Sequence, residues 1–127
     1  MSMIKGKNTK PEIIVRKFLH ANGYRFRLHY EKLPGKPDIV LPKYKIAIFI
    51  NGCYWHGHEN CKYFKPPKTN TEWWLNKINE TIERDKRKYE EIKNNNWRIK
   101  IIWECELKKT KIQQTLENLL QFLENEK

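Results

Sequence analysis

Residues 38–50 read DIVLPKYKIAIFI, two short apolar runs joined by a polar turn. The first run, 38–41, stops at Pro42, because proline has no N–H to donate inside a sheet. The second run, 45–50, is apolar almost throughout and long enough for a strand at the centre of a sheet. These two strands form the expected middle of the fold.

Helical and strand patterns lie on both sides of this pair. The expected helices cover residues 9–22, 71–93 and 111–123, and the expected strands cover 24–30, 38–41, 45–50 and 97–103. Thr9 opens the first helix with a Thr-x-x-Glu capping box, and Gly23 is placed to end it. This order predicts one α/β domain over residues 1–127, with a single mixed β-sheet flanked by helices.

The charge of the chain indicates an anionic partner. The sequence holds 26 Lys plus Arg and 15 Asp plus Glu, a net charge of +11. Residues 5–45 alone carry eleven basic and three acidic side chains, a net charge of +8. Such a field suits a phosphate backbone, an anionic membrane or an acidic protein, and it also keeps a protein in solution. With no run near the roughly 20 apolar residues of a transmembrane helix, we expect a soluble nucleic-acid-binding protein.

The cysteines indicate a metal site. Their number, three, is odd, and residues 1–10 hold no signal-peptide core, so we expect a reducing cytoplasm rather than a disulfide framework. Three thiolates and one imidazole are a ligand set for structural Zn²⁺. The candidate ligands are Cys53, His58, Cys61 and Cys105. His56 and Glu59 are rival ligands, and the alternative is a set of ordinary buried cysteines.

A carboxylate begins the first of the two central strands. Asp38 follows a Pro-containing turn, and a carboxylate in that place can hold Mg²⁺ against a phosphate oxygen. The Pro-Asp pair and the element order resemble the PD-(D/E)xK nuclease core. Where that core carries its second motif, acidic-x-Lys, this sequence has residues 49–51, FIN. This difference disfavours a standard member of the PD-(D/E)xK nuclease superfamily. His56, whose ordinary pKa is about 6.5, can move protons in place of the lysine or be a solvated loop histidine.

Residues 51–58, NGCYWHGH, resemble the central motif of the very short patch repair (Vsr) endonucleases. Further motifs follow the family's pattern in order, within about residues 4–107, at 7–12, 33–38, 67–70, 72–78, 83–85 and 97–107. Members of this family nick DNA 5′ to the thymine of a T:G mismatch, which arises by deamination of 5-methylcytosine. The resemblance implies a PD-(D/E)xK nuclease-like (restriction-endonuclease-like) core with a structural zinc site.

The resemblance also implies roles for single residues. Asp38 is the Mg²⁺-binding carboxylate, aided by the backbone carbonyl of Ile50. His56 is the catalytic histidine, and Glu12 is the acidic residue that the first helix contributes. The zinc ligands are the same four residues that the cysteine pattern selects.

DNA contacts are implied at the same loop. Tyr54 and Trp55 match an aromatic pair that enters the base stack beside the mismatch. Separating the bases there costs less free energy, because a T:G pair is weaker than a matched pair. The alternative is that both rings pack around the zinc site. The basic residues expected to hold the DNA backbone are Arg25, Arg27, Lys65 and Lys68.

Three features depart from the family pattern, and one is the spacing between His58 and Cys61, which is one residue longer than in some members. Asn51 stands where studied members carry a second active-site histidine, and an amide can orient water or phosphate but takes no proton at neutral pH. The family's N-terminal arm places a methionine in the opposite DNA groove. Counting back from Glu12 puts that position at Met1, with Met3 as the substitute, so we expect a truncated arm or a looser clamp on DNA.

The sequence therefore predicts a cytoplasmic bacterial enzyme, a Mg²⁺-dependent and strand-specific endonuclease that acts as a monomer on T:G-mismatched duplex DNA. The family further implies mismatch-repair proteins and an associated cytosine-5 methyltransferase as partners. Two alternatives stay open. One is a nicking or restriction-associated nuclease that reads an ordinary sequence, and the other is a zinc-stabilised DNA-binding module without catalysis.

Overall fold

The computed structural model describes residues 10–28, 30, 32–33, 35–53 and 68–125. In chain order its elements are α1 (Lys10–Ala21), β1 (Arg27–Leu28), β2 (Ile39–Leu41), β3 (Ile46–Asn51), α2 (Thr71–Asn94), β4 (Arg98–Trp103), the short 3₁₀ helix η1 (Glu104–Leu107) and α3 (Ile112–Glu124). Within these residues, no helix is long and apolar enough to cross a membrane.

The four strands form one mixed sheet in the order β1-β2-β3-β4. β1 pairs with β2 and β2 with β3 in antiparallel fashion, whereas β3 and β4 are parallel. Parallel strands need a crossover, and α2 supplies it between β3 and β4. The predicted α/β class and the mixed sheet are therefore confirmed.

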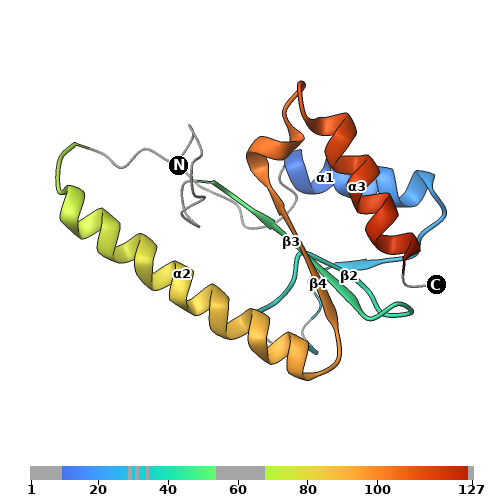
Figure 1. Ribbon diagram of the computed structural model, residues 1–127, viewed down its shortest axis with the longest axis horizontal. Helices are drawn as coiled ribbons and strands as arrows, with labels where there is room; N and C mark the ends of the chain where they lie inside the picture. The colour runs from blue at the N-terminus through green and yellow to red at the C-terminus, as the bar shows by residue number, and fades with distance from the viewer. Residues whose placement is uncertain (1–9, 29, 31, 34, 54–67, 126–127) are drawn as a thin grey trace.

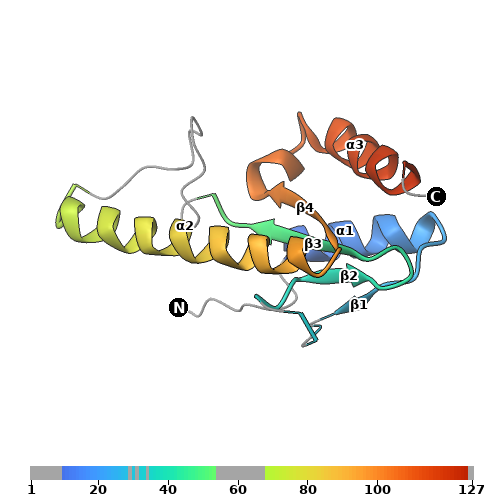
Figure 2. The same cartoon turned by 60° about the horizontal axis from the view of Figure 1, so that its bottom comes forward.

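Helices cover both faces of the sheet, α1 and α3 on one and α2 on the other (Figures 1 and 2). The side chains of β2 and β3 alternate between these faces, as strand geometry requires. The side chains that pack against α1 and α3 are those of Ile39, Leu41, Ile46 and Ile48. Those in the cluster with Ile92 of α2 are Val40, Ala47 and Phe49. Burial on both faces explains why the sequence of β3 is apolar almost throughout.

Helix α2 packs on the sheet through only part of its length. Its buried residues are Ile78, Asp85 and Ile92, and its N-terminal half extends past the end of the sheet (Figure 1). Trp73, in this projecting half, keeps 54% of its surface exposed. The projecting half is therefore an arm whose first turns expose Trp73, although Ile78 further along it is buried.

The strand expected over residues 24–30 is much shorter in the structure. β1 has two residues, because β2, the strand it pairs with, has three. Tyr24 cannot join the strand, since its N–H donates to the carbonyl of Leu19 and closes the end of α1. Gly23 has a φ of 80°, so it ends α1 as predicted. Thr9, the predicted cap, lies outside the described residues.

Candidate functional site

A tight turn delivers Asp38 to the end of the sheet. Gly35 and Lys36 have φ values of 79° and 47°, and Asp38 comes directly before β2. A Cβ on Gly35 would lie 2.8 Å from Cδ of Lys88, so the turn also packs closely against α2. Glycine is required here both by the backbone conformation and by this close approach.

The Asp38 carboxylate is fixed by the neighbouring strand. Because β2 and β3 are antiparallel, the start of β2 lies beside the end of β3. The backbone N–H of Ile50 donates to Oδ2 of Asp38 at 2.7 Å, and this hydrogen bond is half-buried. The sheet thus holds the carboxylate in one orientation.

The oxygen atoms around Asp38 suit a hard divalent cation. In an extended strand the N–H and C=O of one residue point to the same side, so the Ile50 carbonyl faces the same side as the bond to Asp38. Mg²⁺ prefers carboxylate and carbonyl oxygens. Asp38 and Ile50 therefore fit the ligands that the sequence suggested for Mg²⁺.

Asn51 ends β3 on the α2 side of the sheet. Its side chain is 4% exposed, and Nδ2 donates to the hydroxyl oxygen of Tyr89 at 3.0 Å. The Tyr89 ring meets Phe49 edge-on, with 5.1 Å between the ring centroids. In the sequence, Tyr89 lies within the helix expected over residues 71–93, and nothing in its spacing distinguishes it from a core residue.

Two carboxylates act on the Tyr89 hydroxyl. Burial raises the pKa of the Tyr89 phenol above its ordinary value; the hydrogen bond from Asn51 lowers it, and the negative charges of Asp85 and then Asp38 raise it. Asp85 is itself buried, and its Oδ1 lies 3.7 Å from Nζ of Lys88. The α2 side of this sheet end therefore combines a neutral phenol, an amide and negative charge.

Cys53 and Cys105 come together because β3 and β4 are parallel. Each cysteine follows the C-terminal end of one of these strands, so both lie at the same end of the sheet. Both are buried, and the backbone N–H of Cys105 donates to Sγ of Cys53 at 3.4 Å. Two thiols are part of a ligand set that suits Zn²⁺, and this contact brings the backbone of one cysteine against the sulfur of the other. His58 and Cys61 lie outside the described residues, and the described part alone holds no group of three metal-ligating side chains.

Glu12 lies in the first turn of α1 and is 2% exposed. Nη2 of Arg16, one turn further on, lies 3.2 Å from its Oε1. A buried carboxylate is normally paired, and this pair meets that requirement. The structure thus places Glu12 in a buried ion pair.

A basic pocket lies at the other end of the sheet. Arg27 pairs with Val40 of β2, and the pocket opens beyond the last residue of β2. It has a volume of about 450 Å³ and no acidic residue among its described lining. The lining residues are Gly23, Arg25, Phe26, Arg27, Pro42, Lys43 and Tyr44. Arg25 and Arg27 therefore lie away from Asp38, which precedes the first residue of β2.

The remaining predicted DNA contacts divide into two groups. Lys68 is exposed shortly before α2. The others lie outside the described residues, and so does the predicted catalytic histidine: Met1, Met3, Tyr54, Trp55, His56 and Lys65.

The projecting arm of α2 carries aromatic surface that the sequence assigned to a helix face. Trp73 meets Trp74 edge-on, with 4.8 Å between the ring centroids, and Nζ of Lys77 lies 5.8 Å from the Trp73 ring. An exposed ring beside a cation suits a nucleic-acid base and its phosphate. Trp74 is half-buried, so the exposed ring of this pair is that of Trp73.

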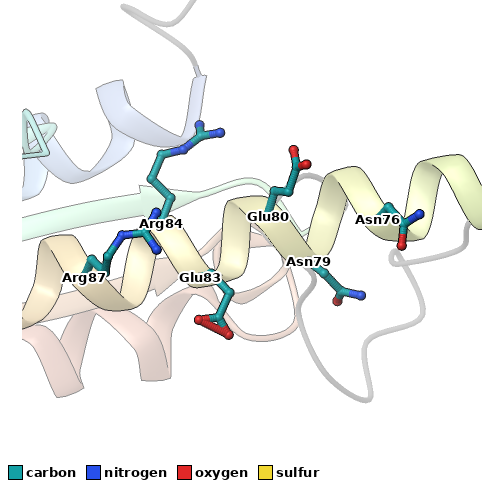
Figure 3. Close-up of a pocket in the computed structure, with 6 residues that line it drawn as sticks. All are labelled: Asn76, Asn79, Glu80, Glu83, Arg84 and Arg87. Atoms are coloured by element: carbon teal, nitrogen blue, oxygen red, sulfur yellow. The ribbon is translucent and has the colours of Figure 1, made fainter.

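A shallow groove of about 620 Å³ runs along the same helix (Figure 3). Within the part of the chain that the structure describes, its lining residues all come from α2: Asn76, Asn79, Glu80, Glu83, Arg84 and Arg87. Because two glutamates and two arginines share this helix surface, we interpret the groove as a solvated helix surface and assign it no role.

Comparison with known proteins decides the family. Residues 1–62 match the family model described as DNA mismatch endonuclease Vsr. A type II nicking enzyme of Xanthomonas oryzae, V.XorIIP, is 45% identical over 107 residues, which are 84% of this chain and 78% of that protein. The chain belongs to the Vsr family.

Two further relatives support membership in the Vsr family. The type II nicking enzyme V.NmeAIP of Neisseria meningitidis is 47% identical, over 85% of this chain and 76% of its own length. The DNA mismatch endonuclease Vsr of Escherichia coli is 41% identical, over 85% of this chain and 69% of its own length. As a Vsr-family member, the protein is a DNA-cleaving hydrolase, and the family resemblance expected from residues 51–58 is confirmed.

Proposed function

We propose that this Vsr-family protein nicks one strand of duplex DNA 5′ to the thymine of a T:G mismatch, with Mg²⁺ as its cofactor. The observation that carries this proposal is the Asp38 carboxylate, fixed by Ile50 N–H at 2.7 Å beside the end of β3. A metal-assisted nuclease needs an oriented carboxylate that can face a phosphodiester. The element order is consistent with a PD-(D/E)xK nuclease-like core.

Each residue of the site then has a task. When bound, Mg²⁺ supplies Lewis-acid stabilisation of the charge that grows on the phosphate. Asp38 and the Ile50 carbonyl would hold the ion, and the Asn51 amide would orient water or a phosphate oxygen. His56 moves the proton, Glu12 assists from α1, and the aromatic pair Tyr54–Trp55 enters the base stack.

Structural zinc belongs to the same proposal. The thiols of Cys53 and Cys105, two cysteines in contact through Cys105 N–H and Cys53 Sγ, would supply half of a tetrahedral set that His58 and Cys61 would complete. The ion would tie the loop after β3 to the end of β4. We propose that the protein acts as a monomer in the bacterial cytoplasm, with mismatch-repair proteins and a cytosine-5 methyltransferase as functional partners.

One specific finding favours a second function. Two of the three relatives described above carry the name type II nicking enzyme rather than mismatch endonuclease. A nuclease that nicks an ordinary sequence would use the same carboxylate and the same metal. It would differ in not needing a mismatch.

Nicking of end-labelled duplexes tests the proposal. One duplex carries a single T:G mismatch in a CT(A/T)GG context, and its control carries T:A at the same position. We expect a nick 5′ to the mismatched thymine that needs Mg²⁺, is absent with T:A, and is lost in Asp38→Ala. Glu117→Ala, an exposed carboxylate on α3, is the control variant and is expected to cleave like the parent protein.

The other outcomes are equally informative. Equal cleavage of both duplexes would support the sequence-reading nuclease and refute the mismatch requirement. Tight binding in EDTA, with no cleavage of any duplex when Mg²⁺ is added, would refute catalysis and support a DNA-binding module.

A further inference from the structure

Tyr89 of α2 contacts the site from a helix that contributes no metal ligand. Its hydroxyl oxygen accepts the hydrogen bond from Asn51 Nδ2 at 3.0 Å. We propose that Tyr89 is a positioning residue for DNA cleavage and holds the Asn51 amide in the orientation that the reaction uses. This inference rests on the proposed function.

Strand geometry places Asn51 beside Asp38. Side chains alternate along β3, so Asn51 lies on the same face as Phe49, the α2 face. Asp38 precedes Ile39, which pairs with Ile48 and faces α1 and α3, so Asp38 also lies on the α2 face. The amide and the carboxylate are therefore neighbours on one face, at the same end of the sheet.

The hydrogen bond restricts what the amide can do. An asparagine amide has two N–H donors and one carbonyl acceptor. Tyr89 takes one N–H, which fixes the amide plane and leaves the second N–H and the carbonyl oxygen for a water molecule or a phosphate oxygen. Without the hydroxyl, the terminal torsion of Asn51 would be free, because this torsion is broad in asparagine.

Tyr89 is itself held firmly. Its ring packs edge-on against Phe49, and Ile92, less than one helical turn further along α2, is fully buried. The raised pKa of the phenol keeps its proton in place across the neutral range. The hydroxyl is thus a fixed, neutral acceptor at the end of a packed helix.

The position of Asn51 gives this contact its significance. The family resemblance places a second active-site histidine there, and an imidazole can be oriented and protonated in ways that an amide cannot. An amide that cannot titrate can contribute only through its orientation. A residue that fixes this orientation therefore matters more than it would beside a histidine.

The test compares two Tyr→Phe variants from the same apolar cluster. Tyr89→Phe removes the hydroxyl and keeps the ring against Phe49. Tyr30→Phe, the matched control, removes a hydroxyl from the ring that lies 5.9 Å from Trp97 in the cluster on that face. Single-turnover nicking with Mg²⁺ and mismatched-duplex binding in Ca²⁺ are measured for both variants, for Asn51→Ala and for the Asn51→Ala/Tyr89→Phe double variant.

We expect Tyr89→Phe to slow nicking about tenfold, which corresponds to the loss of one orienting hydrogen bond. Its duplex Kd should stay within about twofold of the parent value, because the contacts that bind the ground state and the transition state equally are unchanged. Tyr30→Phe should leave the nicking rate unchanged. In the double variant the second substitution should add no further loss, because Tyr89 acts through Asn51.

Three results would overturn the inference while the proposed function stands: an unchanged rate in Tyr89→Phe, an equal loss in Tyr30→Phe, or additive losses in the double variant. A parent protein that cleaves no duplex would overturn the proposed function and this inference together. The nitrogen-edited NMR signal of the Asn51 side-chain amide is a separate readout. It should shift in Tyr89→Phe and not in Tyr30→Phe, and an unmoved signal would refute the hydrogen bond itself.

Discussion

Gly35→Ala should damage both the stability and the activity of the protein. At a φ of 79° a residue with a Cβ is strained, at a cost of roughly 1–2 kcal/mol. The new Cβ would also lie 2.8 Å from Cδ, 3.0 Å from Cγ and 3.1 Å from Cβ of Lys88. Crowding of this kind adds about 1–3 kcal/mol, because the Lys88 side chain must change rotamer and its Cβ, at 3.1 Å, leaves the turn only a few tenths of an ångström to adjust. We therefore expect the free energy of unfolding to fall by roughly 2–5 kcal/mol.

Gly23→Ala is the matched control for the backbone effect. Its φ is 80°, but nothing lies within 4 Å of the added Cβ. Only the backbone strain of roughly 1–2 kcal/mol should appear there. The difference between the two variants, measured by urea denaturation, isolates the contact between the turn and α2.

Activity and a second substitution complete the experiment. Asp38 lies three residues after Gly35, so the displaced turn should slow nicking in Gly35→Ala far more than in Gly23→Ala. Lys88→Ala removes Cγ and Cδ but keeps Cβ at 3.1 Å, so it should restore part of the stability lost in Gly35→Ala. Equal losses of unfolding free energy at both glycines, with no rescue, would refute the close packing of this turn against α2.

Three other predictions concern pH, metal and salt. The pKa of Tyr89 in the folded state lies above its unfolded value of about 10, so its contribution to stability is complete below pH 10 and is lost as pH rises through the folded pKa. In urea denaturation at alkaline pH, the free energy of unfolding should therefore decline less with pH in Tyr89→Phe than in the parent protein. An identical decline would contradict the raised pKa. Purified protein should contain about one zinc ion per chain by mass spectrometry. Cys105→Ser should lose this ion and have a lower Tm. An unchanged zinc content in Cys105→Ser would exclude the proposed zinc site. Replacing Arg25, Arg27 and Lys43 by Ala should weaken DNA binding and reduce the salt slope of log K by roughly 2–3; an unchanged slope would show that the basic pocket makes no phosphate contact.

The fold could be predicted largely because its central strands are buried on both faces. A run such as residues 46–50 has few alternatives to a central strand, and the crossover helix follows from its apolar spacing. The length of β1 could not be predicted, because an edge strand extends only as far as its partner offers pairing. The apolar–basic alternation of residues 24–28 survives as alternating burial, although only two of these residues form ladder pairs.

The site was predictable in its residue types and less so in its contacts. Asp38 stood out because a carboxylate follows a proline before a strand. Tyr89 did not stand out, because a tyrosine on the apolar face of a helix resembles any core aromatic. Its hydroxyl matters only because the sheet brings Asn51 within 3.0 Å across 38 residues of chain, and sequence spacing carries no information about such a contact.

Helix α2 joins two regions that the rest of the fold keeps apart. Trp73 on the projecting arm and Tyr89 at the site are sixteen residues apart, which is about 24 Å along a helix axis. An α-helix bends little over that length unless a proline or a bulge interrupts it, and α2 contains no proline. The end of the helix that packs on the sheet carries Tyr89, and the projecting end carries Trp73. The exposed tryptophan and the tyrosine that contacts Asn51 therefore belong to one continuous helix, which the core holds at Ile78, Asp85 and Ile92.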